Sequence, residues 1–231
     1  MVVIIQNDSQ VPLGNYCETL ADETVPYRIV RSFDGDALPD LAAVTAVIVL
    51  GGAMGANDDE SFPFLSDVKL FIRKVVAQGI PYLGICLGGQ LLAAVSGGEV
   101  VSQADGEKGT MPVYLTAAGA SDPLFAGIPK EFTTFQWHSD TFYPPVEALL
   151  LAGSPACPRQ AFRVGTAAYG LQFHPEVTRE IVDSWVRWTD ETAAEVGIFQ
   201  DDFTAHERDY RAVSRCMLKN FLRIAGLPLT R

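Results

Sequence analysis

The first segment that could carry chemistry is a cysteine between glycines, in the stretch 81–90, PYLGICLGGQ. An apolar run ends at Cys86 and helix-forming residues follow it, which is the pattern G-x-C-x-G of a nucleophile elbow. Gly84 and Gly88 suit this turn, because a Cβ at either position would collide with neighbouring backbone. The helix start would favour the thiolate, and the N–H of Leu87 could stabilise an oxyanion. The alternative is a small buried cysteine in a glycine-rich turn.

A second segment, 170–176 with the sequence GLQFHPE, could supply a base for this thiol. His174 ends an apolar run and the proline after it stiffens the chain, so Glu176 would face the same side as the imidazole. A carboxylate in that place can hold the ring that takes the nucleophile's proton. The chain has only three histidines. His138 is the rival for the role of base, and His206 lies in a polar stretch and is predicted to be a surface residue.

These two segments together resemble the signature of the class I (triad) glutamine amidotransferase family, which is G-x-C-x-G-x-Q followed far downstream by H-P-E. Within that family the chain is similar to a free-standing GMP-synthase-like glutamine amidotransferase domain. The resemblance covers nearly the whole chain. It implies that Cys86 is the nucleophile, that His174 acts as base and acid, and that Glu176 orients the His174 ring.

The same resemblance implies which groups surround the reacting amide. The segment 49–52, VLGG, ends an early strand at the place where the family uses a Gly-Gly turn. Gly52 and Leu87 would therefore donate backbone N–H groups to the oxyanion, and Gln90 would contact the bound glutamine. One residue departs from the family pattern, because Ala53 stands where the family often has proline.

A third segment, 135–140 with the sequence FQWHSD, lies where related amidotransferases place a loop for the α-amino and α-carboxylate groups of glutamine. A zwitterionic amino acid needs an anion and several N–H or O–H donors close together. His138, Ser139 and Asp140 offer both, so we predict that they bind the substrate. The alternative is a solvated turn beside a packed Trp137.

The elements that must position these residues follow an alternating pattern. Up to residue 98, short β-branched runs alternate with helical stretches, which predicts parallel strands joined by crossover helices. Beyond residue 98, shorter runs between turn residues predict a mixed or antiparallel extension. Helices are expected at 64–78, 178–188 and 205–224. The expected strands are 2–6, 27–31, 46–50, 82–85, 112–115, 131–136, 148–152, 160–164 and 167–173.

The pattern and the resemblance predict an α/β fold of three layers, with a central, mostly parallel (mixed) sheet flanked by helices. This is the flavodoxin-like class I glutamine amidotransferase fold. The sequence contains no internal repeat and no Ser/Gly linker. Residues 1–231 are therefore expected to form a single domain, with a C-terminal helical extension from about 193 to 231.

Composition excludes several classes of protein. Asp and Glu number 28 against 17 Lys and Arg, and the formal charge of -11 would repel nucleic acid and anionic membranes. The N-terminus lacks the basic region of a signal peptide, which predicts a cytoplasmic protein.

The four cysteines lie far apart without a C-x-x-C pair, so neither a zinc site nor a disulfide framework is indicated, and no metal or cofactor is expected. The acidic stretch 57–60 could select an amine-bearing substrate, but a solvated helix start is favoured.

The predicted function is hydrolysis of the γ-carboxamide of glutamine through a thioester on Cys86, which gives glutamate and ammonia. In this family a synthetase normally consumes the ammonia, and we expect that synthetase to be a separate partner. An independent γ-glutamyl hydrolase or peptidase would use the same chemistry and is the alternative. A non-catalytic regulatory module is a third hypothesis, against which the intact Cys86, His174 and Glu176 argue.

Overall fold

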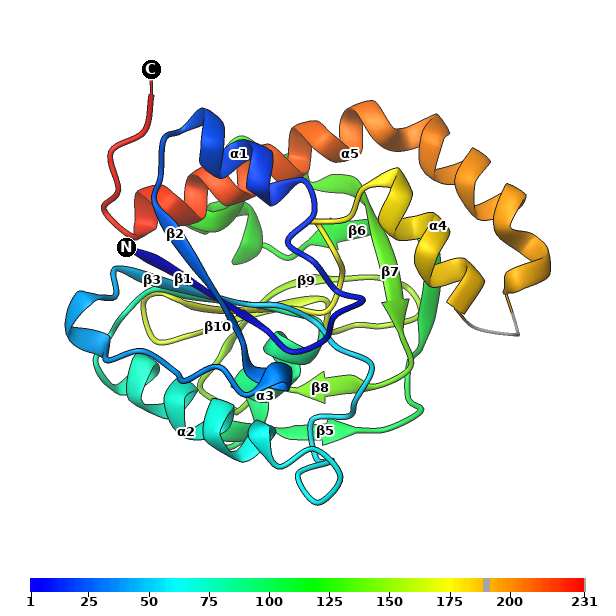
Figure 1. The fold of residues 1–231 in the computed structure, drawn as a ribbon. Coiled ribbons are helices and arrows are strands. Elements are labelled where there is room, and N and C mark those ends of the chain that lie inside the picture. The colour runs from blue at the N-terminus through cyan, green and yellow to red at the C-terminus, as the bar shows by residue number, and fades with distance from the viewer. Residues whose placement is uncertain (189–191, 231) are drawn as a thin grey trace.

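The computed structural model describes residues 1–188 and 192–230, and Figure 1 shows their helices on both sides of a central sheet. The helices are α1 (Tyr16–Asp22), α2 (Phe64–Ala77), α3 (Leu87–Val95), α4 (Arg179–Trp188) and α5 (Val196–Ile224). The main sheet contains β1 (Val2–Gln6), β2 (Tyr27–Arg31), β3 (Ala46–Val49), β4 (Tyr82–Ile85), β6 (Glu107–Leu115), β7 (Glu131–His138), β9 (Leu149–Gly153), β10 (Ala161–Val164) and β11 (Ala168–Leu171). A second sheet consists of β5 (Glu99–Val101) and β8 (Thr141–Tyr143).

The nine strands of the main sheet lie in the order β2-β1-β3-β4-β11-β10-β9-β6-β7. The pairs from β2 to β11 are parallel, whereas β11 and β10, β10 and β9, β9 and β6, and β6 and β7 pair antiparallel. The sheet is therefore mixed, with a parallel half in which β11 lies beside four strands from the first part of the chain. This confirms the predicted three-layer α/β fold.

The parallel strands form because their sequences suit burial on both faces. Every residue of β1, β3 and β4 is buried, and β1 (VVIIQ) and β3 (AVIV) are nearly continuous β-branched runs. Strand β4 instead carries Gly84 in its third position, which prepares the turn at its end. These three strands therefore form the rigid centre from which the site is built.

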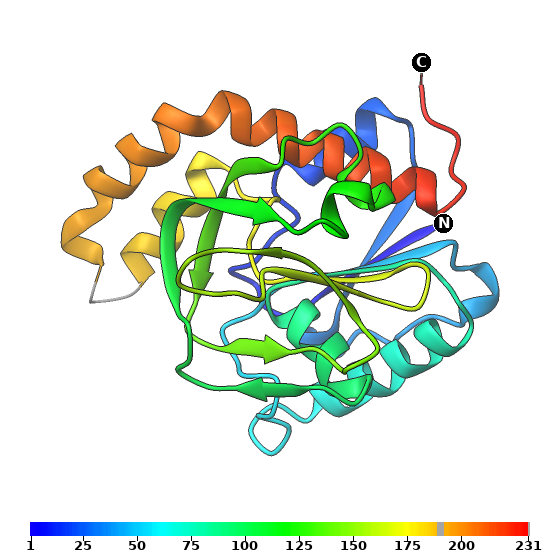
Figure 2. The same ribbon diagram turned by 180° about the vertical axis from the view of Figure 1, so that it is seen from behind.

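The two helical layers cover opposite faces of the sheet. Tyr16 of α1, Trp185 of α4 and Phe221 of α5 belong to one hydrophobic cluster, and Phe71 of α2 and Leu91 of α3 belong to another. Figure 1 shows α1, α4 and α5 above the sheet and α2 and α3 below it, and Figure 2 shows the same layers from behind. The long helix α5 thus closes the face on which α4 lies.

Some predicted boundaries were wrong. The last helix begins at Val196 rather than at 205, and the last strand is Ala168–Leu171 rather than 167–173. Strands β5 and β8 were not predicted, because each has only three residues and is too short for an alternating pattern. That residues 1–231 form one domain stays a prediction, and residue 231 of the predicted extension lies outside the described residues.

In the part of the chain that the structure describes, no helix combines the length and apolar character needed to cross a membrane. The cytoplasmic location expected from the sequence stays a prediction.

Candidate active site

Cys86 lies in a sharp turn between β4 and α3. Its backbone has φ 49° and ψ -107°, a backbone conformation that residues other than glycine rarely adopt. The neighbouring glycines permit this turn, because a Cβ on Gly84 would lie 2.3 Å from the carbonyl oxygen of Gly88. A Cβ on Gly88 would lie 2.1 Å from the carbonyl oxygen of Val49. The segment has the elbow geometry expected from G-x-C-x-G.

Register brings His174 to this turn from a distant part of the chain. Strands β4 and β11 are parallel neighbours, with Ile85 opposite Leu171, so the residues after both strands leave the sheet at the same edge. The N–H of Cys86 donates to the carbonyl oxygen of Leu171 at 2.8 Å. The N–H of His174 is held in turn by the carbonyl oxygen of Phe135, also at 2.8 Å. Cys86 and His174 therefore line the same pocket.

The His174 ring is oriented by a buried carboxylate. Its Nδ1 lies 2.7 Å from Oε1 of Glu176, which is fully buried. Burial lowers the pKa of His174, but the charges of Glu176 and Cys86 outweigh it and raise this pKa to about 10. The imidazole is therefore positively charged near neutral pH, and with Nδ1 used by Glu176 its Nε2 is left for the sulfur.

Two further contacts at these residues were missed by sequence reasoning. The side-chain amide of Gln172 donates to Sγ of Cys86 at 3.8 Å, so the sulfur has a second donor besides the imidazole. The ring of Trp185 meets the His174 ring edge to face, with centroids 4.7 Å apart. The position of Gln172, two residues before His174, was a signal for the first contact. Nothing in the sequence pattern indicated the second.

The Gly-Gly turn after β3 lies against the same groups. A Cβ on Gly51 would lie 3.1 Å from Cε1 of His174, and a Cβ on Gly52 would lie 2.9 Å from Cδ2 of Leu87. At the position where the family often has proline, the N–H of Ala53 donates to Oδ2 of Asp8 at 3.1 Å. A proline has no N–H and could not make this bond. In this chain the bond to Asp8 fixes the loop that proline often stiffens in the family.

The pocket in front of Cys86 has a volume of about 580 Å³. The residues predicted to bind substrate, Gln90, His138, Ser139 and Asp140, all line it. Nε2 of Gln90 donates to the carbonyl oxygen of Asp140 at 3.3 Å, and Oδ1 of Asp140 accepts from the Ser102 hydroxyl at 2.8 Å. These contacts join α3 to the 102–106 loop at the pocket. The three tryptophans of the chain, Trp137, Trp185 and Trp188, complete the wall.

A second group of Cys, His and Glu side chains lies behind this wall, formed by Cys157, His138 and Glu107. Its thiol is unsuited to attack, because Cys157 is fully buried and its burial raises the pKa of the thiol. Nε2 of His138 faces Glu107 at 3.5 Å. His138 therefore contacts Glu107 and not Cys86. His174 is the histidine that the structure places beside the elbow cysteine.

The other sequence candidates lie outside the pocket or at its mouth. His206 is exposed on α5, as predicted. In the acidic stretch 57–60, Asp59 pairs with Lys69 of α2, whereas Asp58 lines the pocket and accepts from the N–H of Gly55 at 2.7 Å. The stretch therefore anchors its own loop to α2.

The fold and this geometry define an α/β protein with a thiol on an elbow and a carboxylate-held imidazole beside it. The family described as "Glutamine amidotransferase class-I" matches residues 9–184, and the chain belongs to this family. The glutamine amidotransferase-like protein YfeJ of Salmonella typhimurium is 30% identical over 198 residues, which are 84% of this chain and 83% of that protein.

One subunit of the glutamine-hydrolysing GMP synthase of Methanococcus maripaludis is 32% identical over 77% of this chain and 88% of its own length. Several longer GMP synthases also match, but the chain covers only 24% to 29% of their lengths. Among solved structures, a glutamine amidotransferase from Thermotoga maritima superposes with a TM-score of 0.87, 29% identity and 97% coverage of both chains. These similarities confirm the family that the two motifs indicated.

Proposed function

We propose that this protein hydrolyses the side-chain amide of glutamine and supplies the ammonia to a separate synthetase. The Cys86 thiolate attacks the amide carbon, and the tetrahedral intermediate collapses with cleavage of the C–N bond as His174 gives its proton to the leaving ammonia. Water then attacks the thioester, with His174 taking its proton. Glutamate leaves and the thiolate is restored.

The observation that carries this proposal is the arrangement of Cys86, His174 and Glu176. A thiol on an elbow, an imidazole whose pKa is raised to about 10 and a carboxylate 2.7 Å from Nδ1 are the parts that thioester chemistry needs. The charged ring stabilises the attacking sulfur and carries the proton that ammonia must receive.

Gly52 and Leu87 are our candidates for the oxyanion donors. Leu87 begins α3, and the first N–H groups of a helix have no acceptor within that helix. The close approach of Gly52 to the Leu87 side chain supports placing both N–H groups beside the oxygen of the attacked amide. Gln90, Ser139 and Asp140 are proposed to hold the α-amino and α-carboxylate groups, with His138 fixing the carbonyl of Asp140.

The separate partner is supported by the relative from Methanococcus maripaludis, which is itself named as one subunit of a GMP synthase. The chain covers 88% of the length of that relative. By analogy, this chain would release ammonia to another protein that consumes it.

The pocket favours a second candidate, hydrolysis of γ-glutamyl amides. A volume of about 580 Å³ is within the range of sites for drug-sized ligands and exceeds what one glutamine fills. The tryptophans Trp137, Trp185 and Trp188 give part of this space an aromatic lining that glutamine alone would not need. A γ-glutamyl compound with an apolar amine would use it.

One experiment tests both candidates. The purified protein is treated with a diazoketone analogue of glutamine and the modified residue is located by mass spectrometry, with the exposed Cys17 as the internal control. We expect labelling of Cys86 alone, and release of glutamate that is lost in Cys86→Ala. Turnover of γ-glutamyl anilides faster than glutamine would favour the second candidate. Failure to label Cys86 would support the non-catalytic hypothesis and overturn both.

A further inference from the structure

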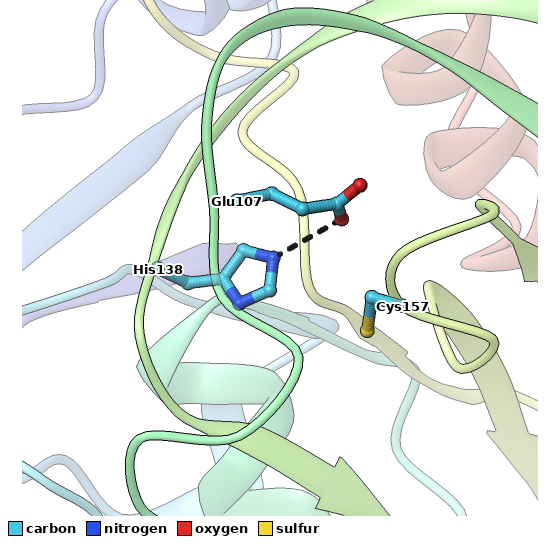
Figure 3. Close-up of side chains that lie close together, drawn as sticks. All are labelled: Glu107, His138 and Cys157. Atoms are coloured by element: carbon cyan, nitrogen blue, oxygen red, sulfur yellow. Dashed lines mark ion pairs between the residues drawn. The ribbon is translucent and has the colours of Figure 1, made fainter.

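The cluster of Glu107, His138 and Cys157 has the composition of a metal site (Figure 3). Glu107 begins β6 and His138 ends β7, and the antiparallel register of these strands places the two residues opposite each other. Cys157 comes from the connection between β9 and β10. Exposed fractions of 6%, 6% and 0% show that all three are buried. One ligand atom of each lies within 4.8 Å of the others.

The His138 ring directs its second nitrogen, Nε2, at this cluster. Its Nδ1 lies 3.0 Å from the carbonyl oxygen of Asp140, and because a carbonyl can only accept, Nδ1 carries the hydrogen. In a neutral ring the other nitrogen, Nε2, is then an acceptor. It is buried without a hydrogen-bond partner in the described structure, and Oε2 of Glu107, also an acceptor, faces it at 3.5 Å. Two acceptors in this position need either a proton or a metal ion between them.

Neighbouring side chains hold the other two ligands in place. The Ser154 hydroxyl donates to Oε1 of Glu107 at 2.7 Å, and the Gln160 amide donates to Oε2. The N–H of Cys157 donates to the Ser154 hydroxyl at 2.9 Å, and the Thr141 hydroxyl lies 3.3 Å from the sulfur. Metal ligands are commonly oriented in this way by hydrogen bonds to surrounding residues.

We propose that Glu107, His138 and Cys157 bind a zinc ion. Nitrogen, oxygen and sulfur donors together suit Zn²⁺, whereas Mg²⁺ and Ca²⁺ prefer oxygen alone. Donors at about 2.0–2.3 Å from a tetrahedral zinc ion lie about 3.3–3.8 Å apart. The nitrogen and oxygen already have this spacing, and the sulfur needs a shift of about 1 Å at most to reach it.

Binding exchanges the thiol proton of Cys157 for the metal. The S–H bond breaks, the proton leaves to solvent, and the sulfur electron pair forms the bond to zinc. The ion would join β6, β7 and the connection between β9 and β10 directly behind the pocket wall. It thereby fixes the ring that holds the carbonyl of Asp140, which also accepts from Gln90.

The test uses the full chain with Cys86→Ala, so that the elbow thiol cannot bind the metal instead. After treatment with a chelator, Zn²⁺ is titrated against a chromophoric competitor, and Co²⁺ is added separately to detect sulfur-to-cobalt charge transfer. We expect one Zn²⁺ per chain, a higher Tm with zinc, and a cobalt–thiolate absorption band. Cys157→Ser and Glu107→Gln should each weaken binding at least about 100-fold.

Cys17→Ser is the matched control, because Cys17 is exposed and lies outside the cluster. It should leave the zinc affinity and the cobalt band unchanged. Circular dichroism shows whether each variant folds, and if Cys157→Ser does not fold, the cobalt band of the Cys86→Ala protein decides. Absence of that band, absence of stoichiometric zinc, or binding that survives Cys157→Ser would overturn the proposal. In any of these cases, a proton on Nε2 of His138 occupies the position between His138 and Glu107, and no metal ion does.

Discussion

The hydroxyl of Tyr210 donates to the main-chain carbonyl of His174 at 2.9 Å. Tyr210 is on α5, which lies beyond residue 184, where the match to the family ends. The phenol is fully buried and packs against Phe203 of the same helix, with ring centroids 5.0 Å apart. The last long helix is therefore connected directly to the residue that we propose as base.

Tyr210→Phe should reduce both stability and turnover. It leaves the buried His174 carbonyl without this donor, which costs about 1–3 kcal/mol, and it loosens the segment that carries the imidazole. Urea unfolding and glutaminase kcat measure the two effects. Tyr114→Phe is the control, because Tyr114 is 42% exposed on β6. Unchanged stability and kcat in Tyr210→Phe would show that α5 does not position His174.

The backbone of Cys86 predicts an unusual order of stability among its variants. A Cβ is strained at φ 49° and ψ -107°, and glycine is not. Cys86→Gly should therefore be more stable than Cys86→Ala by about 1–2 kcal/mol, although both lack the thiol and should be inactive. Denaturant midpoints of the two variants provide the measurement. If the alanine variant is as stable as the glycine variant, the turn is not strained.

The elbow could be predicted from the sequence because its signals are local. Gly84, Cys86 and Gly88 lie within five residues, and an apolar strand and a helix flank them directly. The pairing of His174 with Glu176 is also local, since they are two residues apart. Their meeting with Cys86 depended on β4 and β11 being neighbours, which the resemblance implied and periodicity alone did not.

Contacts set by register could not be predicted in this way. Glu107 faces His138 because β6 and β7 pair in one of several available registers, and Cys157 joins them from another connection. Cysteine spacing therefore gave no sign of this cluster. The bond from Tyr210 to His174 depends likewise on how α5 crosses the sheet, which its amphipathic pattern does not determine.

Alanine at either elbow glycine should destabilise the fold. The added Cβ would lie 2.3 Å from a carbonyl oxygen at Gly84 and 2.1 Å at Gly88, and both oxygens belong to backbone that cannot move aside cheaply. We expect a loss of about 3 kcal/mol or more for each variant. Gly197→Ala is the matched control, because a Cβ there meets nothing within 4 Å and Gly197 lies in a helix. Thermal unfolding that shows equal Tm values for all three variants would contradict the tight turn.

The charge of His174 predicts how its pKa responds to its two neighbours. The charge of Glu176 is the largest cause that raises this pKa and the charge of Cys86 is the next, so Glu176→Gln and Cys86→Ala should each lower it. In the double variant only burial remains of the main causes, and the pKa should fall below the ordinary value of 6.5. NMR titration of the ring carbons measures these values, and only three histidines need assignment.

The same groups determine how stability depends on pH. In the native protein the folded pKa of His174, about 10, lies above the unfolded value of 6.5, so its contribution to stability is complete below pH 6.5 and is lost as the pH rises through 10. In the double variant the folded pKa lies below the unfolded one, and this dependence should reverse in sign. Urea unfolding between pH 6 and pH 10 gives the difference between the two proteins, in which titrating groups other than those at positions 86, 174 and 176 cancel. A difference that does not change over this range would mean that Glu176 and Cys86 do not hold the proton on His174.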